Sequence, residues 1–420
     1  MLSLERETVE LGLEQVPGWV AEHRRAGFEA FSGLSMPAGE EVWKYIDLDF
    51  DVRAVALARG PGDPMAGSPY AGGLAASLIV DGAVVSVADS PEGVSVTPFR
   101  QAIADSPDLA RRATGWGVPP DDIFAAAHQA FGSDGLLIHA GRGVASAQPV
   151  VIEIQSTIPD SISFPHVGVW LEDNAELHLI VVQRSVEGFV VVVPVVEVVA
   201  GDGARLRMTT VQNWGRGTTG VAYQRVRMGR DADVKTGEVG LGGALGRLDI
   251  GFDLDGNGSN CEIFGVSFGD QTQVMDYRMV INHRGKNTSS NVFLKGAVED
   301  QAESVFTGLL RIAENATNTS AFEKNRNLVL SEGAKAHSVP NLEILCDDVV
   351  CGHGSTVGPL EEEHLYYLRS RGLSQERAER LLVRGFFEEI IARLPASVVA
   401  EPVRQAVYAK FIEAQAEGRV

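Results

Sequence analysis

Cysteine is scarce in this sequence, with three residues in 420: Cys261, Cys346 and Cys351. Three thiols cannot form a disulfide framework, so free thiols in a reducing compartment are expected. The first fifteen residues, MLSLERETVELGLEQ, are acidic and amphipathic and lack the features of a secretory signal. We therefore expect a cytoplasmic protein.

Basic residues are also few, 36 Lys and Arg against 56 Asp and Glu, for a formal net charge of -20. This balance argues against nucleic acid and anionic membranes as partners, because phosphate binding needs clustered Lys and Arg. No long apolar run occurs either. The most apolar stretch, FVVVVPVVEVVA from Phe189, is interrupted by Pro194 and Glu197 and is shorter than the roughly 20 residues of a membrane helix.

Motifs of the common enzyme classes are missing from the sequence. There is no GxxxxGK[ST] phosphate loop, so we expect no ATP hydrolysis by that route. The stretch GLGGALG at 240–246 departs from the dinucleotide fingerprint, because Leu245 stands where the third glycine belongs. GxSxG, HExxH and paired CxxC motifs are absent too.

Short runs of alternating apolar and polar residues fill residues 149–360, broken by turn-like tetrads such as DNAE, DGAR, RDAD, DQAE and EGAK. From Ala175 onward, the small residue in each tetrad recurs at intervals of about 14 residues or about twice that value. Periodic short strands with a small residue at each corner predict a β-solenoid, whose coils stack on one another. A large antiparallel sandwich with similar turn spacing is the alternative.

Helical patterns flank this region and suggest four parts. They are a helical region and linker at 1–75, a mixed transition region at 76–148, the β core at 149–360 and a helical domain at 361–420. Ser374 is a good N-cap for one C-terminal helix, whose apolar residues, among them Ala378, are expected on one face. The predicted docking residues of this domain are Leu365, Leu381, Leu382, Phe386 and Ile390.

The stretch CDDVVCGHGSTVG at 346–358 brings Cys346, Cys351 and His353 close together in sequence. Cysteine and histidine are ligands suited to iron or zinc. In a strand, Cys351 and His353 would project to the same face about 6.5–7 Å apart, which is wide for ligands of one tetrahedral ion. A closed zinc site within this chain is therefore not expected, whereas a site shared with a second chain stays open.

These residues could also have a purely structural role. Buried free cysteine behaves as a small hydrophobic residue, and we expect this for Cys261 and Cys346. His283 and His337 are expected to be solvated turn residues rather than ligands. For Cys351 and His353, spacing alone does not decide between a structural and a functional role.

The same stretch resembles the SufB/SufD family of iron–sulfur assembly proteins. The similarity is carried by EEVWKYIDL near the N-terminus, LGGALGRLDI at 241, LKGAVEDQAESVF at 294 and NLEILCDDVVCGHGSTVG at 341–358. These stretches span most of the chain in the family's order. The SufB branch usually carries an acidic residue after the motif histidine, where this chain has Gly354, so the resemblance favours the SufD branch.

The resemblance implies a right-handed parallel β-helix between helical regions, and a scaffold rather than an enzyme. SufD-type chains pair with SufB through their β-helices and bind the SufC ATPase through C-terminal helices. The complex builds nascent iron–sulfur clusters. The motif histidine corresponds to His353, implied as an interface ligand with Cys351 beside it; the cluster would be transient and shared with SufB. Gly352 and Ser355 replace the more usual Ser and Ala.

The implied complex is associated with a reduced flavin, for which no binding fingerprint is readable here, and no cofactor is expected to stay bound to this chain alone. Three other readings remain. The chain could be a SufB-like paralogue, a homodimeric β-helix without a metal role, or an enzyme using Cys351 and His353 as nucleophile and base. The last lacks an evident third group to orient the base.

Overall fold

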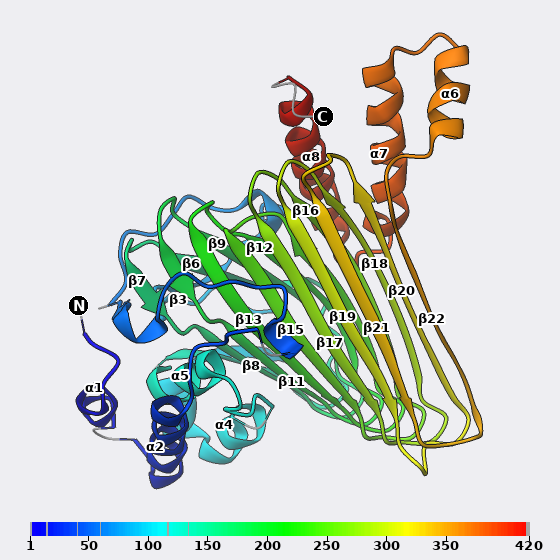
Figure 1. Cartoon of the computed structure of the whole chain (residues 1–420). Helices are drawn as coiled ribbons and strands as arrows, with labels where there is room; N and C mark the ends of the chain where they lie inside the picture. Colours follow the sequence, from blue (N-terminus) through cyan, green and yellow to red (C-terminus); the bar gives the residue numbers. More distant parts are fainter. Residues whose placement is uncertain are drawn as a thin grey trace.

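The computed structural model describes residues 2–13, 16–39, 41–58, 60–115, 117–132 and 134–416. Its centre is a parallel β-solenoid of about eight coils with helices on its flanks (Figure 1). The prediction of a solenoid between two helical regions is confirmed, and the antiparallel sandwich is excluded. The space that the two sheets enclose is called the lumen below.

One of the two sheets has the strand order β21-β19-β17-β15-β13-β11-β8-β5-β4. We call it sheet A. Its strands are β1 (Ala56–Leu57), β4 (Val94–Pro98), β5 (Gly135–Ala140), β7 (Ser161–Ser163), β8 (His166–Leu171), β10 (Val190–Val192), β11 (Val195–Ala200), β13 (Thr218–Met228), β15 (Leu245–Leu254), β17 (Val274–His283), β19 (Glu303–Ile312) and β21 (Lys335–Ile344).

The second sheet, sheet B, has the order β22-β20-β18-β16-β14-β12-β9-β6-β2-β3. Its strands are β2 (Ser77–Val80), β3 (Ala83–Ser86), β6 (Val150–Ser156), β9 (Glu176–Ser185), β12 (Arg205–Asn213), β14 (Asp233–Gly240), β16 (Asn260–Gly269), β18 (Ser289–Val298), β20 (Thr319–Val329) and β22 (Val349–Gly358). Since β2 and β5 already pair in parallel with β6 and β8, the sheets begin before residue 149.

The chain alternates between the sheets, so one coil consists of two strands and two turns. Asn260 is in register with Ser289, 29 residues later, which is about twice the 14-residue unit seen in the sequence. Each unit is thus half a coil. At the turns, residues such as Asn174 (φ 58°) and Asp231 (φ 56°) adopt left-handed backbone conformations, which Asn and Asp tolerate. The small residues that follow, Ala175 and Ala232, are buried.

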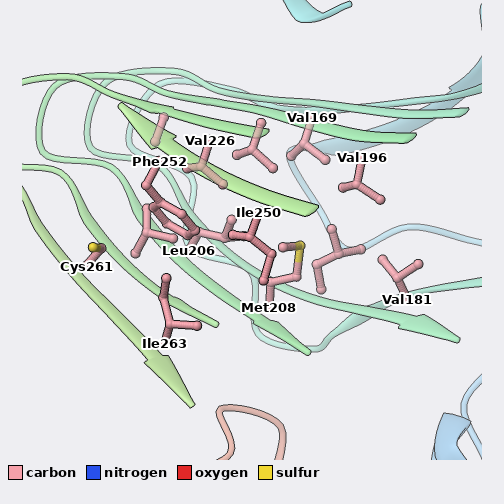
Figure 2. Close-up of a cluster of buried hydrophobic side chains, with 14 of the residues drawn as sticks. Val169, Val181, Val196, Leu206, Met208, Val226, Ile250, Phe252, Cys261 and Ile263 are labelled. Atoms are coloured by element: carbon pink, nitrogen blue, oxygen red, sulfur yellow. The ribbon is translucent and has the colours of Figure 1, made fainter. Parts of the chain in front are cut away.

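Alternate residues of each strand point into the lumen and form the main core. Figure 2 shows Leu206, Met208, Ile250 and Phe252 packed together there, with the thiol of Cys261 among them. Burial raises the pKa of the Cys261 thiol well above its ordinary value. Cys261 is therefore a core residue, as expected from the sequence.

Helices of the N-terminal part cover the outer face of sheet A. The cluster that joins them includes Phe31, Trp43 and Phe124 from the helical side and Val195 and Val221 from the strands. The elements are α1 (Arg6–Leu11), α2 (Gly18–Gly33), η1 (Glu41–Trp43), η2 (Val52–Ala54), α3 (Phe99–Asp105), α4 (Pro107–Ala113) and α5 (Ile123–Phe131). The short helix η3 (Pro69–Ala71) instead packs on the outer face of sheet B.

Three C-terminal helices follow the last strand: α6 (Glu362–Ser370), α7 (Gln375–Ile391) and α8 (Ser397–Ala416). Phe387 of α7 and Phe411 of α8 pack in one cluster with Phe264 and Phe268 on the outer face of sheet B. Helix α6 projects away from the solenoid (Figure 1). Within the described residues, no helix combines the length and apolar character needed to cross a membrane.

Candidate functional site

The last coil, β21 and β22, is exposed on one side, and we call it the open end. In the described part of the chain, β21 pairs only with β19 and β22 only with β20. Large apolar side chains are exposed here, with Val350 at 65%. The others are Phe322, Ile344, Leu345 and Val357. Unpaired edge strands and grouped apolar surface are typical of a face that pairs with another chain.

Both predicted ligand residues lie on β22. Cys351 is in register with Ala321 and His353 with Glu323. In-register neighbours of a parallel sheet project to the same side, and both residues of β20 are buried. Cys351 and His353 therefore face the lumen at the open end: Cys351 is half-buried against the core, whereas His353 is exposed.

The open end does not complete a metal site by itself. Among the described residues, no group of three or more His, Cys, Asp or Glu side chains is close enough to hold one ion. The other thiol of this stretch, Cys346, is buried in the main core, as expected. Any metal bound at His353 therefore needs further donors from outside this chain.

Two other histidines differ from their prediction as solvated turn residues. His283 ends β17 inside the lumen, where its ring nitrogens lie 2.8 Å from Thr288 Oγ1 and 2.9 Å from Ser290 Oγ. Burial lowers the pKa of His283 to about 4. His337 lies within β21 and stacks on Tyr45 with ring centroids 4.1 Å apart. Both predictions were wrong: His283 is the last residue of β17, just before the turn, and His337 is the third residue of β21.

Glu323 is a feature of the open end that the sequence did not reveal. Its side chain is in the lumen, the residue is only 3% exposed, and its carboxylate lies against Gly308 of β19, where an added Cβ would collide with both oxygens. Neither oxygen has a hydrogen-bond partner within the described residues. Burial raises the pKa of Glu323 to about 8.

The lumen next to Glu323 is polar. Asn325 and Asn327 are buried on the same strand, and Asn327 Nδ2 donates to Asn325 Oδ1 over 2.6 Å. Ser355 of β22 is in register with Asn325. Behind them a small cavity is lined by both asparagines together with Ser267 and Ser304. The last two coils thus combine an exposed imidazole, a half-buried thiol and a buried carboxyl group.

A comparison with known protein families matches residues 153–386 to the family described as SUF system FeS cluster assembly, SufBD core domain. The chain belongs to the SufBD family. The matched region begins in β6 and ends in α7, so it includes the whole open end. The resemblance found in the sequence is confirmed, and the family is one of iron–sulfur cluster assembly proteins.

Individual relatives agree with this assignment. The chain is 35% identical over 299 residues to an iron-sulfur cluster assembly SufBD family protein of Mycobacterium tuberculosis, covering 69% of this chain and 74% of the relative. It is 29% identical over 291 residues to the iron-sulfur cluster assembly protein SufD of Bacillus subtilis, covering 66% and 65%. To SufD of Escherichia coli it is 32% identical over 173 residues, 41% of each chain.

In this SufBD-family chain, the predicted docking residues of α7 do not share one face. Leu381 is 49% exposed, while Leu382 and Phe386 are half-buried and line a cavity between α7 and the end of β22. Ile390 is fully buried against sheet B, so it is not available for docking. The reason is geometric: a series of four-residue steps winds around a helix and turns its last member into the core. Leu365 is half-buried on α6.

A second pair of His and Glu lies at the other end, under the N-terminal helices. His166 Nε2 donates to Glu197 Oε2 over 3.0 Å, and the backbone N–H groups of Gly115 and Gly117 donate to the same carboxylate over 2.6 and 2.7 Å. Burial acts to raise the pKa of Glu197, but His166 and the two amides outweigh it and lower the pKa to about 2.

The proton positions in this buried pair follow from its neighbours. His128 Nδ1 lies 2.8 Å from the Val193 carbonyl oxygen, which can only accept, so the other nitrogen of His128 accepts. That nitrogen lies 3.3 Å from His166 Nδ1, which therefore donates. Both ring nitrogens of His166 are donors, and the ring is the cationic partner of Glu197. Burial lowers the pKa of His128 to about 3, consistent with a neutral ring.

Proposed function

We propose that this chain is a SufD-type, non-ATPase scaffold subunit that pairs with a SufB-like chain through its open end and contributes His353 to a nascent iron–sulfur cluster. The observation that carries the proposal is the imidazole of His353, which faces the lumen on an uncovered last strand. Membership of the SufBD family supplies the chemical context.

The open end has the features that pairing requires. Strands β21 and β22 have one edge without a partner in the described chain, and such edges accept a strand from another molecule. The exposed apolar side chains beside them, led by Val350 and Leu345, would lose contact with water on pairing. Pairing would also bring donors of a second chain next to His353.

The donor types suit iron. Imidazole nitrogen and thiolate sulfur both bind iron, and the imidazole must be neutral to do so. His353 is the exposed donor, and Cys351 lies two residues away on the same side. We propose that the cluster is the cargo of the complex, held transiently between two chains. No residue of this chain is assigned to the reduced flavin implied by the family resemblance.

A SufC-like ATPase is proposed to dock on α6 and the exposed side of α7. Tyr366 on α6 is 77% exposed, and Leu381, Leu382 and Phe386 of α7 line one cavity. Helix α7 is tied to the solenoid, because Lys295 Nζ of β18 donates to Glu389 Oε2 over 2.6 Å. ATP-driven movement of the ATPase would therefore pull on the later coils and open the pairing interface.

The test is anaerobic co-expression with candidate SufB-like and SufC-like chains, followed by pull-down and iron and sulfide analysis. We expect His353→Ala to keep the complex but to lose cluster formation. Normal cluster formation in His353→Ala would exclude the ligand role. We expect Leu381→Asp to lose the ATPase without unfolding; retained ATPase binding would exclude docking on this side of α7.

The same open edge could also pair with a second copy of this chain. Size-exclusion chromatography of the chain alone and with its candidate partners separates the two cases. A homodimer that persists in the presence of a SufB-like chain would favour an interaction protein without a metal role over the scaffold subunit.

A further inference from the structure

Glu323 has a position that the fold itself does not explain. A buried carboxyl group normally has hydrogen-bond donors around it, since leaving its oxygens unpaired is costly. Glu323 is almost fully buried, and both of its oxygens lack a partner among the described residues. On the same strand, Asn325 accepts a hydrogen bond from Asn327 through Oδ1, and its own Nδ2 donates to neither oxygen of Glu323.

The carboxyl group lies close to the one place where the lumen is open. Glu323 is the in-register neighbour of His353, and adjacent strands are about 4.8 Å apart. Both side chains project into the lumen, one from the last coil and one from the coil before it. Gly308 across the lumen has no side chain, which leaves the space that the carboxylate occupies.

Another buried acid in the lumen provides a contrast. Glu238 of β14 lies three coils further in along sheet B and accepts a hydrogen bond from Gln224 Nε2 over 2.8 Å. Its environment is closed by coils on both sides. Of the two Glu238 oxygens only Oε2 lacks a partner, whereas both Glu323 oxygens lack one, and no coil beyond β22 covers Glu323 in the described chain. An unpaired acid at the open end therefore points to a ligand that enters from outside.

We propose that Glu323 and His353 together form a two-donor half-site for ferrous iron at the open end, completed by donors from the paired chain. This inference rests on the proposed function and adds a carboxylate to its single imidazole. Oxygen and imidazole nitrogen are suitable donors for a divalent first-row metal. The ion would supply the positive charge that the buried carboxylate lacks. The described residues contain no group of three or more His, Cys, Asp or Glu side chains that could hold an ion. A site with only two donors from this chain is consistent with that.

The test uses the purified full-length chain under anaerobic conditions, with Co²⁺ as the probe, read by its visible absorption and by calorimetry. We expect His353→Ala and Glu323→Gln each to weaken the His353-dependent binding by roughly tenfold or more. The double variant should bind Co²⁺ no more strongly than either single variant, because both donors belong to one site. Glu238→Gln is the matched control and should bind Co²⁺ like the unmodified chain.

Stability separates a ligand role from a structural one. Glu323→Gln keeps the volume of the side chain, so the metal-free variant should melt no lower than the unmodified chain, while its stabilisation by Co²⁺ is lost. If Glu323→Gln does not fold, Glu323→Asp withdraws the oxygens by one methylene and should also weaken binding; unweakened binding by Glu323→Asp would then count against the half-site.

The outcomes distinguish this inference from the function on which it rests. Normal Co²⁺ binding by Glu323→Gln, with weakened binding by His353→Ala, overturns the role of Glu323 and leaves that of His353. If His353→Ala binds Co²⁺ like the unmodified chain, the half-site does not exist. Co-purification with the partner chains then still decides the scaffold role.

Discussion

The two ends of the solenoid each hold a His and a Glu from neighbouring coils, in opposite circumstances. At the N-terminal end, Glu197 is buried but receives hydrogen bonds from His166 and from two backbone amides, under a layer of helices. At the open end, Glu323 is equally buried and has no partner within the described residues, while His353 is exposed. The first pair is complete without another molecule, whereas the second is not.

This difference teaches where stability and function lie in the molecule. A satisfied buried ion pair fixes the N-terminal helices on sheet A, and breaking such a pair is costly. An unsatisfied buried acid contributes nothing comparable and is retained where binding requires it. The pair at the N-terminal end therefore stabilises the fold by itself, whereas the polar groups of the open end are those for which we propose a partner.

The largest expected effect is on the closed pair. Glu197→Gln removes the charge opposite the buried His166 and should lower the free energy of unfolding by about 3–5 kcal/mol. Urea unfolding measures this. The matched control is Glu172→Gln, whose carboxylate accepts from His139 Nε2 over 3.0 Å near the surface. Glu172→Gln should lower the free energy of unfolding by about 1 kcal/mol or less. Equal losses in the two variants would remove the distinction between the ends.

The two acids should give stability opposite dependences on pH. Burial raises the pKa of Glu323 from 4.5 to about 8. Between these two pH values, the folded chain keeps a proton on Glu323 that the unfolded chain has released. Its contribution to stability is complete below about pH 4.5 and is lost as the pH rises through about 8. For Glu197, with a pKa lowered to about 2, the contribution is present above about pH 4.5 and lost in acid.

Unfolding measured between about pH 5 and about pH 8 tests the Glu323 half of this expectation. One proton changes the slope by at most about 1.4 kcal/mol per pH unit. Glu323→Gln should remove a decline of stability with pH that the unmodified chain shows. Identical slopes for the two proteins would mean that Glu323 does not titrate in this range.

The smallest expected effect on stability concerns the exposed apolar surface. Val350→Lys should change the free energy of unfolding by no more than about 0.5 kcal/mol, because the side chain is mostly exposed. It should nevertheless prevent pairing, since a lysine on an edge strand disfavours strand addition. Leu11→Lys is the control at the opposite end, where Leu11 is also exposed. Analytical ultracentrifugation with the SufB-like chain should show lost pairing for Val350→Lys alone.

Much of the fold could be predicted from the sequence because the solenoid is periodic. Several corners repeat the same arrangement, a left-handed residue followed by a small one, so residues such as Ala175 and Ala232 revealed the length of a coil in the sequence. The separation of the α7 residues into exposed and buried ones could not be predicted, since Leu381 and Ile390 differ in exposure only through the packing of the helix on sheet B.

The candidate site was predicted only in part. Cys351 and His353 stood out by residue type, but their common orientation into the lumen follows from pairing with β20, 30 residues away in sequence. Glu323 was missed because an acid between polar residues in AFEKNRN is normally assigned to the solvent side of a strand. Its orientation depends on the register of Ala321 and Asn325, and on the space left by Gly308.

The in-register stacking of coils also fixes the length of the solenoid. Each coil advances the structure by about 4.8 Å, so the first and the last of about eight coils lie roughly 34 Å apart. That length grows by one coil at a time, and a coil takes 27 residues from Asp233 to Asn260 and 32 from Glu303 to Lys335. The distance from the helix-covered end to the open end therefore changes in steps of one strand spacing.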